Sequence, residues 1–323
     1  MAAAIISGLV ATTFTTPASQ QSQLCVSEPW DVNRAKMDAL GVRTTISNVE
    51  AARGADVLII AVKPQVARDV CRELAASWGS SSSSSSSTTA AEKGPDEEEG
   101  EPQAKRAKVA DSSATPSASN DQNKLPLVVS IAAGITAASL RKWTTTADGR
   151  APPIVRVMPN TPALLGEGAS GVYADAEVSE AQREQVAALL GSVSKVTEWV
   201  DREELLDVVT GLSGSGPAYF FALVEHLITS ATALGLSEEQ ATRLAKQTCL
   251  GAGKMLVDAS SSSSSSDPPP TPAQLRKNVT SPNGTTDAAL KSFAASGFEQ
   301  VVDRAVKAAT DRAAELGATL GAE

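Results

Sequence analysis

The run Val57-Leu58-Ile59-Ile60-Ala61-Val62 is apolar without interruption and stops at Lys63-Pro64. A strand that is covered on both faces of a parallel sheet has this composition, because neither face meets water. The same pattern returns at Leu127–Ile131 and at Ile154–Met158. A helical pattern at Gln65–Ala76 follows the first run. Strands that alternate with helices predict an α/β fold with a Rossmann-like, doubly wound sheet in the N-terminal part of the chain.

Each of the three runs ends in a short segment of small or rigid residues. These segments are Ala61–Pro64, Ile131–Gly134 and Met158–Pro162. In open α/β sheets a ligand binds outside the carboxyl ends of the strands. We therefore expect one flat ligand to lie along these three strand ends.

The strand pattern disappears from Ser179 onward. The segment Pro217–Leu234 is apolar around much of its helical circumference, which predicts burial against a second chain as well as its own. We predict two domains. Residues 1–176 form the Rossmann-like NAD(P)-binding domain, and residues 177–323 form an all-α domain for substrate binding and dimerisation.

Two stretches lack the apolar residues that folding requires. Residues 79–124 consist largely of serine, acidic residues and proline, and residues 260–270 are serine and proline with one aspartate. Such segments bury too little apolar surface to offset the entropy cost of ordering. The sequence predicts a disordered insert at 79–124 and a low-complexity loop at 260–270.

A tight turn is predicted at Ser281-Pro282-Asn283-Gly284, which has proline second, asparagine third and glycine fourth. An apolar helical pattern begins directly after it, with Thr285 or Thr286 as the expected N-cap. Free backbone N–H groups at a helix N-terminus attract anions. The stretch therefore predicts either a site for a small carboxylate or phosphate, or an ordinary capped helix.

Composition excludes several classes of function. The formal net charge of −9 argues against general nucleic-acid binding. The three cysteines are far apart and there is a single histidine, so we expect no metal site and no disulfide framework. No apolar run approaches the length of a membrane span, and the cytoplasm is the expected compartment, with an organelle not excluded.

Five segments, in order along the chain, together resemble the pyrroline-5-carboxylate reductase family. They are Ala55–Gln65, Val129–Gly134, Arg156–Pro162, Thr210–Tyr219 (TGLSGSGPAY) and Val279–Thr286 (VTSPNGTT). The last two in one helical domain are strongly specific. The resemblance implies reduction of 1-pyrroline-5-carboxylate to L-proline with NADPH or, as an alternative, NADH, in a homodimer or a larger homo-oligomer.

The resemblance also implies roles for individual residues. The backbone of Gly284 and Thr285 would hold the substrate carboxylate, and Thr286 would lie beside the ring nitrogen as the catalytic residue. The remaining substrate-binding positions are Glu203, Asn278, Val279 and Ser281. The cofactor-binding positions are Asn48, Ala61, Val62, Lys63, Pro64, Ile131, Ala132, Ala133 and Asn278. Asn48 would contact the adenosine end.

The N-terminus departs from the family pattern. Members begin with a strand and a glycine-rich turn that holds the pyrophosphate, whereas Met1–Leu9 matches the helix that follows that turn. We expect Ala2–Ala11 to be this helix, and two interpretations stay open: a chain incomplete at its start, which we favour, or a shortened protein with weak cofactor binding. Glu28 follows a short strand predicted at Leu24–Val26 and would disfavour a 2′-phosphate, unless Arg34 folds back toward it.

Two other functions stay open beside imine reduction. One is a related hydroxyacid or imine reductase with the same layout. The other is a catalytically impaired or structural homologue, lacking the pyrophosphate loop, that acts only as an oligomerising subunit.

Overall fold

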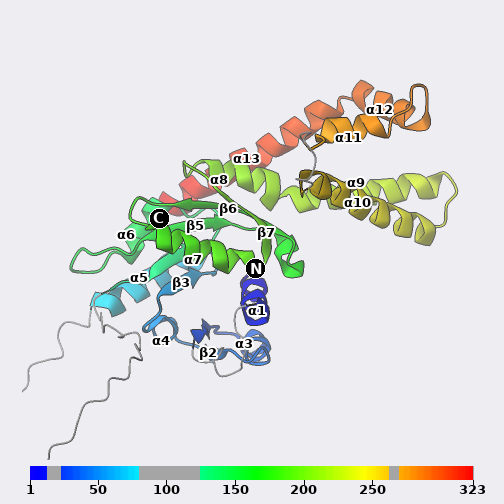
Figure 1. Ribbon diagram of the computed structural model, residues 1–323. Helices are drawn as coiled ribbons and strands as arrows, with labels where there is room; N and C mark the ends of the chain where they lie inside the picture. The colour runs from blue at the N-terminus through cyan, green and yellow to red at the C-terminus, as the bar shows by residue number, and fades with distance from the viewer. Residues whose placement is uncertain (13–22, 80–123, 262–268, 323) are drawn as a thin grey trace, which may run out of the picture.

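The computed structural model describes residues 1–12, 23–79, 124–261 and 269–322 (Figure 1). The predicted disordered insert therefore lies outside the described residues, apart from Gly79 and Lys124. The same holds for residues 262–268 of the predicted low-complexity loop.

The main sheet has five strands in the order β3-β4-β5-β6-β7. Their bounds are β3 Val57–Ile60, β4 Leu127–Ser130, β5 Ile154–Met158, β6 Gly168–Ala174 and β7 Ser194–Trp199. β3, β4 and β5 are parallel, β6 runs antiparallel to β5, and β7 is parallel to β6. The three continuous apolar runs are thus the three neighbouring parallel strands, as predicted.

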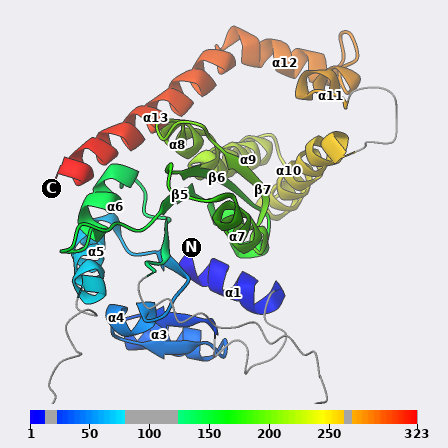
Figure 2. The ribbon, with the colours of Figure 1, turned by 60° about the vertical axis from the view of Figure 1, so that its left-hand side comes forward.

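Helices cover both faces of this sheet, which confirms the doubly wound prediction (Figure 2). α5 (Pro64–Gly79) and α6 (Ala137–Thr144) enclose one core, whose buried side chains include Leu74, Leu140 and Trp143. α7 (Glu180–Gly191) encloses the second core with Val186 and Leu190.

β7 contradicts the prediction that strands end before Ser179. Five of its six residues pair with β6 from Gly168 to Val172, and Lys195 is left out at a register shift, so the sheet extends beyond the expected domain boundary at 176. The sequence pattern missed β7 because it is an edge strand, in which exposed Lys195 and Glu198 interrupt the apolar residues.

A second, two-stranded parallel sheet is formed by β1 (Cys25–Ser27) and β2 (Arg43–Thr45). It is accompanied by α3 (Asp31–Asp38) and α4 (Asn48–Ala52). Within the described residues, no strand links β1 to β3. In the doubly wound order 3-2-1-4-5, one further strand lies at that place.

α1 (Ala2–Thr12) confirms the helix expected at the start of the chain. Its Ile5 and Leu9 are buried against Ala163 and Val193, with Ile59 of β3 also in contact. α1 therefore packs on the main sheet, as a helix that follows a first strand does.

The C-terminal part is helical and extends away from the sheet (Figure 1). It contains α8 Leu205–Val209, a π-helical turn Thr210–Gly214, α9 Gly216–Ala233, α10 Glu238–Ser261, α11 Pro272–Asn278, α12 Thr285–Ala295 and α13 Phe298–Ala322. α9 packs against α10, and α13 runs back from α12 to the Rossmann-like part.

α13 continues through Gly317 to Ala322, although glycine is the residue that most often ends a helix. The glycine has a packing reason instead. A Cβ built on Gly317 would lie 3.4 Å from the carbonyl oxygen of Gly134, so the small residue lets α13 approach the loop after β4. Leu320 then packs against the core that α5 and α6 enclose.

Candidate active site

The ends of β3 and β4 lie side by side, which brings the predicted cofactor residues together. Ile60 pairs with Ser130, and the Ile131 N–H donates to the Ile60 carbonyl oxygen at 3.0 Å. Beyond these pairs, Ala61, Lys63 and Ala133 are exposed. The predicted segments Ala61–Pro64 and Ile131–Ala133 thus form one continuous edge of small side chains and accessible backbone, here called the cofactor edge.

The neighbouring strand end, after β5, is tied to the glycine-rich segment of the helical part. Asn160 is buried, its amide nitrogen donates to the Ser213 carbonyl oxygen at 3.1 Å, and its amide oxygen accepts from the Ala169 N–H at 3.0 Å. Gly214 lies over this strand end, because a Cβ there would be 2.6 Å from the terminal methyl of Met158.

The predicted adenosine end lies at β1 and α4. Asn48 begins α4 but does not cap it: Ser47 is the N-cap and accepts from the Glu50 N–H at 3.2 Å. The Asn48 amide instead donates to Glu73 at 2.8 Å. This bond ties α4 to α5, and the predicted cofactor contact of Asn48 stays a prediction.

Arg34 folds back toward the end of β1. Its guanidinium donates to the Glu28 carbonyl oxygen at 3.1 Å and pairs with Asp31. The Glu28 carboxylate accepts from the Trp30 N–H at 3.0 Å. A cation and an acid therefore stand together where the ribose of a dinucleotide is expected.

The predicted turn at Ser281–Gly284 is present. The Gly284 N–H donates to the Ser281 carbonyl oxygen at 3.0 Å, and Asn283 has a φ of 58°. Asp287 stabilises the turn. Its carboxylate accepts from the Asn283 N–H at 3.0 Å and pairs with Lys291. The Lys291 bond is the main reason why the pKa of Asp287 is lowered.

The N-cap of α12 is Gly284, not Thr285 or Thr286 as predicted. Glycine in an extended conformation serves as an N-cap without a side-chain bond, so both threonines enter the first turn of the helix. Their backbone N–H groups have no partner within the helix. The hydroxyls are consequently not needed for capping. The Gly284 N–H is used in the turn, so the donors left for the expected anion are the N–H groups of the two threonines.

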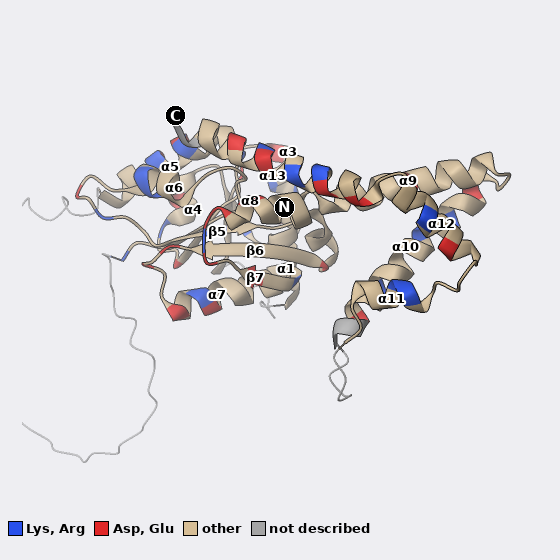
Figure 3. Ribbon diagram, turned by 90° about the horizontal axis from the view of Figure 1, so that it is seen from above, with Lys and Arg blue, Asp and Glu red and all other residues tan. Residues whose placement is uncertain are grey.

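Asn278 and Val279 end α11, next to this turn. Both are exposed, and the Asn278 amide oxygen accepts from Gln274 at 2.7 Å. α11 and α12 lie at the far end of the helical part, away from the main sheet (Figures 1 and 3). One chain therefore gathers the predicted substrate residues 278–286 but does not bring them to its own cofactor edge.

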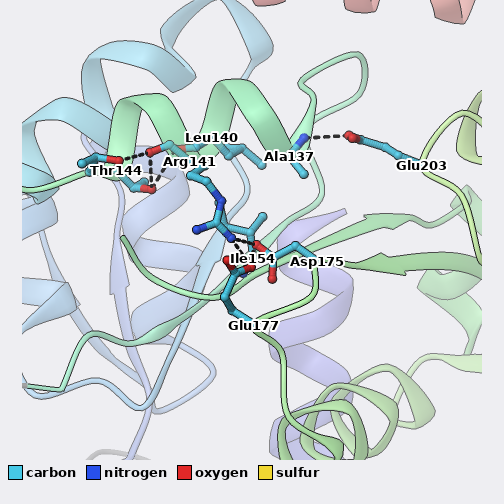
Figure 4. A network of polar contacts seen from close by, with 9 residues as sticks. Ala137, Leu140, Arg141, Thr144, Ile154, Asp175, Glu177 and Glu203 are labelled. Carbon is cyan, nitrogen blue, oxygen red and sulfur yellow. Dashed lines mark hydrogen bonds and ion pairs between the residues drawn. The ribbon is translucent and has the colours of Figure 1, made fainter. Parts of the chain in front are cut away.

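Glu203 lies apart from that turn, beside the sheet. One carboxylate oxygen accepts from the Ala137 N–H at 2.6 Å and from Arg156 (Figure 4 shows the Ala137 bond). Sequence reasoning missed Arg156, although an arginine inside the apolar strand IVRVM signals a buried partner of opposite charge.

The described residues lack two kinds of feature. They contain no group of three or more histidine, cysteine, aspartate or glutamate side chains that could hold a metal ion. None of their helices combines the length and apolar character that a membrane span requires.

Two family models match the chain. The model described as pyrroline-5-carboxylate reductase dimerisation matches residues 203–316. The model described as NADP oxidoreductase, coenzyme F420-dependent, matches residues 1–83. The helical part and the start of the Rossmann-like part thus match independently.

Whole-chain relatives agree with these matches. A pyrroline-5-carboxylate reductase of Pseudomonas aeruginosa is 41% identical over 322 residues, which are 99% of this chain and 95% of the relative. That of Haemophilus influenzae is 34% identical, over 98% of this chain and 94% of the relative.

Solved structures show the same fold. A reductase of this name from Coxiella burnetii is 30% identical with a TM-score of 0.73, covering 98% of this chain and 94% of that one. A Plasmodium falciparum pyrroline carboxylate reductase, solved with NADP bound, is 24% identical with a TM-score of 0.68 at the same coverage. This chain belongs to the pyrroline-5-carboxylate reductase family.

Proposed function

We propose that this chain reduces 1-pyrroline-5-carboxylate to L-proline, the last step of proline biosynthesis, with NADPH as the preferred hydride donor and NADH as a possible one. The observation that carries the proposal is the pairing of two half-sites in one chain. One is the cofactor edge after β3 and β4, and the other is the anion-binding turn before α12.

The substrate is a cyclic imine, which is electrophilic once its nitrogen is protonated. NADPH supplies a hydride that forms the new carbon–hydrogen bond, while the carbon–nitrogen π electrons become the nitrogen lone pair. The protein must then position the ring and stabilise its charges. The Thr285 N–H, directly after Gly284, binds the carboxylate, since the Gly284 N–H already donates to Ser281 within the turn. The Thr286 hydroxyl hydrogen-bonds the ring nitrogen. Asn278, Val279 and Ser281 line the site.

The cofactor edge suits a flat nicotinamide ring. Ala61 and Ala133 are exposed and small, and Gly134 has a φ of +75°, a conformation that favours glycine. Val62–Pro64 and Ile131–Ala132 complete the contact, Asn48 lies toward the adenosine, and Asn278 of the partner subunit reaches the nicotinamide.

The distance between the half-sites within one chain leads to a proposal about assembly. α9 carries a single acidic residue and no lysine or arginine, and Phe220, Phe221 and Leu234 on or just after it are 59%, 69% and 89% exposed (Figure 3). The family match names this part as the dimerisation region. We propose at least a homodimer in which the substrate turn of each subunit completes the cofactor edge of its partner.

Complementation tests this shared site. Thr286→Ala disables the substrate turn, and Ala133→Trp blocks the cofactor edge; each homo-oligomer should be inactive. Co-expression of the two variants should restore about a quarter of the wild-type activity, because half of the dimers are mixed and each mixed dimer has one intact site. If each site lies within one chain, the mixture stays inactive.

The central experiment follows NADPH oxidation by full-length protein with 1-pyrroline-5-carboxylate and, as controls, a panel of hydroxyacids and other cyclic imines. Turnover restricted to the pyrroline substrate supports the proposal. Oligomers without turnover on any substrate would favour the structural-subunit alternative. The cytoplasm stays the predicted compartment.

A further inference from the structure

α13 connects the two half-sites of one chain. It has 25 residues, and a helix of that many residues is about 37 Å long. At one end it follows α12, the helix that begins at the substrate turn, and at the other end it lies beside α6 (Figures 1 and 2). Because an α-helix is hydrogen-bonded along its whole length, its two ends keep a fixed relation to each other.

Packing fixes the first half of α13. The rings of Phe293 in α12 and Phe298 in α13 stack with their centroids 5.2 Å apart. Further along, α13 passes close to the π-helical turn, since a Cβ built on Gly211 would lie 2.9 Å from the Val306 carbonyl oxygen. The direction of α13 is therefore set by its contacts with α12 and with the π-helical turn.

The other end of α13 lies against the loop between β4 and α6. A Cβ built on Gly134 would be 3.4 Å from the Gly317 nitrogen, so backbone meets backbone here. Leu320, about one turn further along, is half-buried and packs against the core that contains Ala132 and Ile135. α13 therefore covers a loop whose first residues belong to the cofactor edge.

The hydrogen bonds of this loop hold its two ends. The Ala132 N–H donates to the Ser130 hydroxyl at 3.3 Å, and Thr136 caps α6 by accepting from the Ser139 N–H at 3.1 Å. Gly134 lies between them with a φ of 75°. Glycine has more backbone freedom than any other residue, so the contact with α13 limits the position of this middle part.

We propose that Leu320 is a positioning residue for hydride transfer, which holds α13 against the Ile131–Gly134 loop and so places this loop against the nicotinamide of the bound cofactor. The inference rests on the proposed function. Leu320 acts through the loop, since its side chain packs on buried core residues. The adenosine end of the cofactor is expected at β1 and α4, a different part of the chain.

Full-length variants test the proposal. Leu320→Ala removes most of the contact with the core, and Leu320→Met restores an apolar side chain of similar volume. Thr319→Ala, a change at the exposed neighbour in the same turn, is the matched control. The ligands are NADPH and 2′,5′-ADP, which shares the adenosine and the 2′-phosphate of NADPH but lacks the nicotinamide. The measurements are Kd for both ligands, kcat, and amide hydrogen exchange.

We expect Leu320→Ala to lower kcat about tenfold or more and to raise Kd for NADPH about threefold or more, because a small misplacement of the groups around the nicotinamide is costly. Kd for 2′,5′-ADP should stay within about twofold, because distant sites are nearly independent. Amides of residues 131–140 should exchange at least about tenfold faster. Leu320→Met should recover most of kcat, and Thr319→Ala should match wild type.

Equal losses of affinity for NADPH and 2′,5′-ADP would overturn the proposal and assign Leu320 a general role in the fold. Unchanged exchange at residues 131–140 would also overturn it. If Leu320→Ala does not fold, Leu320→Val must show the same difference between the two ligands. Failure of the proposed function is a separate result, since wild-type protein would then show no turnover while the exchange measurement still reports on the loop.

Discussion

Arg34 is the residue expected to decide between the two nicotinamide cofactors. Its guanidinium lies at the end of β1, next to Glu28, which would otherwise repel a 2′-phosphate. We predict that Arg34→Ala raises KM for NADPH about tenfold or more and changes KM for NADH little, because a charge-assisted bond to phosphate contributes about 1.5–3 kcal/mol.

The control is Lys36→Ala, which removes the same charge from an exposed position of the same helix. Steady-state kinetics with both cofactors measures the ratio of their kcat/KM values. Equal losses with NADPH and NADH in Arg34→Ala would show that Arg34 supports the local fold and not the phosphate.

Cys71 is a structural residue of α5 and not a reactive thiol. Its side chain is fully buried, and burial raises the pKa of the thiol to about 11. An unfolded cysteine loses its proton near pH 8.5, whereas the folded thiol keeps its proton up to about 11. The folded state therefore binds the proton more tightly, and this residue's contribution to stability falls as pH rises between those values.

We predict that iodoacetamide at about pH 8.5, near the ordinary thiol pKa, labels the half-buried Cys25 while Cys71 stays unmodified until the protein unfolds. Peptide mass spectrometry with and without urea measures the labelling. Modification of Cys71 at the rate of Cys25 in the folded protein would contradict this assignment.

At the scale of elements, the segment Thr210–Gly214 packs directly on α13. A Cβ on Gly211 would lie 2.4 Å from the Thr310 hydroxyl and 2.9 Å from the Val306 carbonyl oxygen, and these two atoms are hydrogen-bonded to each other. We predict that Gly211→Ala lowers the free energy of unfolding by about 1–3 kcal/mol, because the added methyl group forces α13 away.

Gly191→Ala is the control, since a Cβ at the end of α7 meets nothing within 4 Å. Urea unfolding of both variants measures the difference in midpoint. If the two variants unfold at the same concentration, α13 does not depend on this glycine.

The sequence predicted those elements whose pattern is set by burial. β3, β4 and β5 are covered on both faces, so their apolar runs are continuous and their order along the chain indicates a parallel sheet. β7 was not predicted because this edge strand has only two apolar residues, Val196 and Trp199, whose spacing gives neither a continuous apolar run nor an alternation. The C-terminal end of α13 was also not predictable. A glycine after a helical pattern is typical of a C-cap, whereas Gly317 lies inside α13 and contacts Gly134.

The candidate site also has parts that the sequence could predict and parts that it could not. The turn Ser281–Gly284 was predictable, since asparagine and glycine at fixed turn positions determine the backbone locally. The cofactor edge was predictable because the carboxyl ends of neighbouring parallel strands lie at the same edge of the sheet. The bonds of Glu203 with Ala137 and Arg156 were not predictable, because they join residues 66 and 47 positions apart that no local pattern relates.

At the scale of the whole molecule, the strands of the described residues form two separate sheets. In the described residues, β1 pairs only with β2, and β3 pairs only with β4, so a place for one parallel strand lies between β1 and β3 in the doubly wound order. In this fold the turn after that strand carries the backbone N–H groups that hold the pyrophosphate. α1, the helix expected after such a turn, is already packed on Ile59 and Ala163.

We therefore predict that fusing an apolar strand and a G-x-G-x-x-G turn to the start of residues 1–323 lowers the Kd for NADPH at least about tenfold. The strand should also raise the melting temperature, because it supplies hydrogen-bonding partners for the unpaired backbone groups of β1 and β3.

The control carries the same strand with valine in place of the turn glycines. It should gain the thermal stability but not the affinity, because a side chain blocks the approach of backbone to pyrophosphate. Nicotinamide fluorescence and thermal denaturation separate the two effects, and micromolar NADPH binding that the fusion leaves unchanged would show that residues 1–323 hold the pyrophosphate by other means.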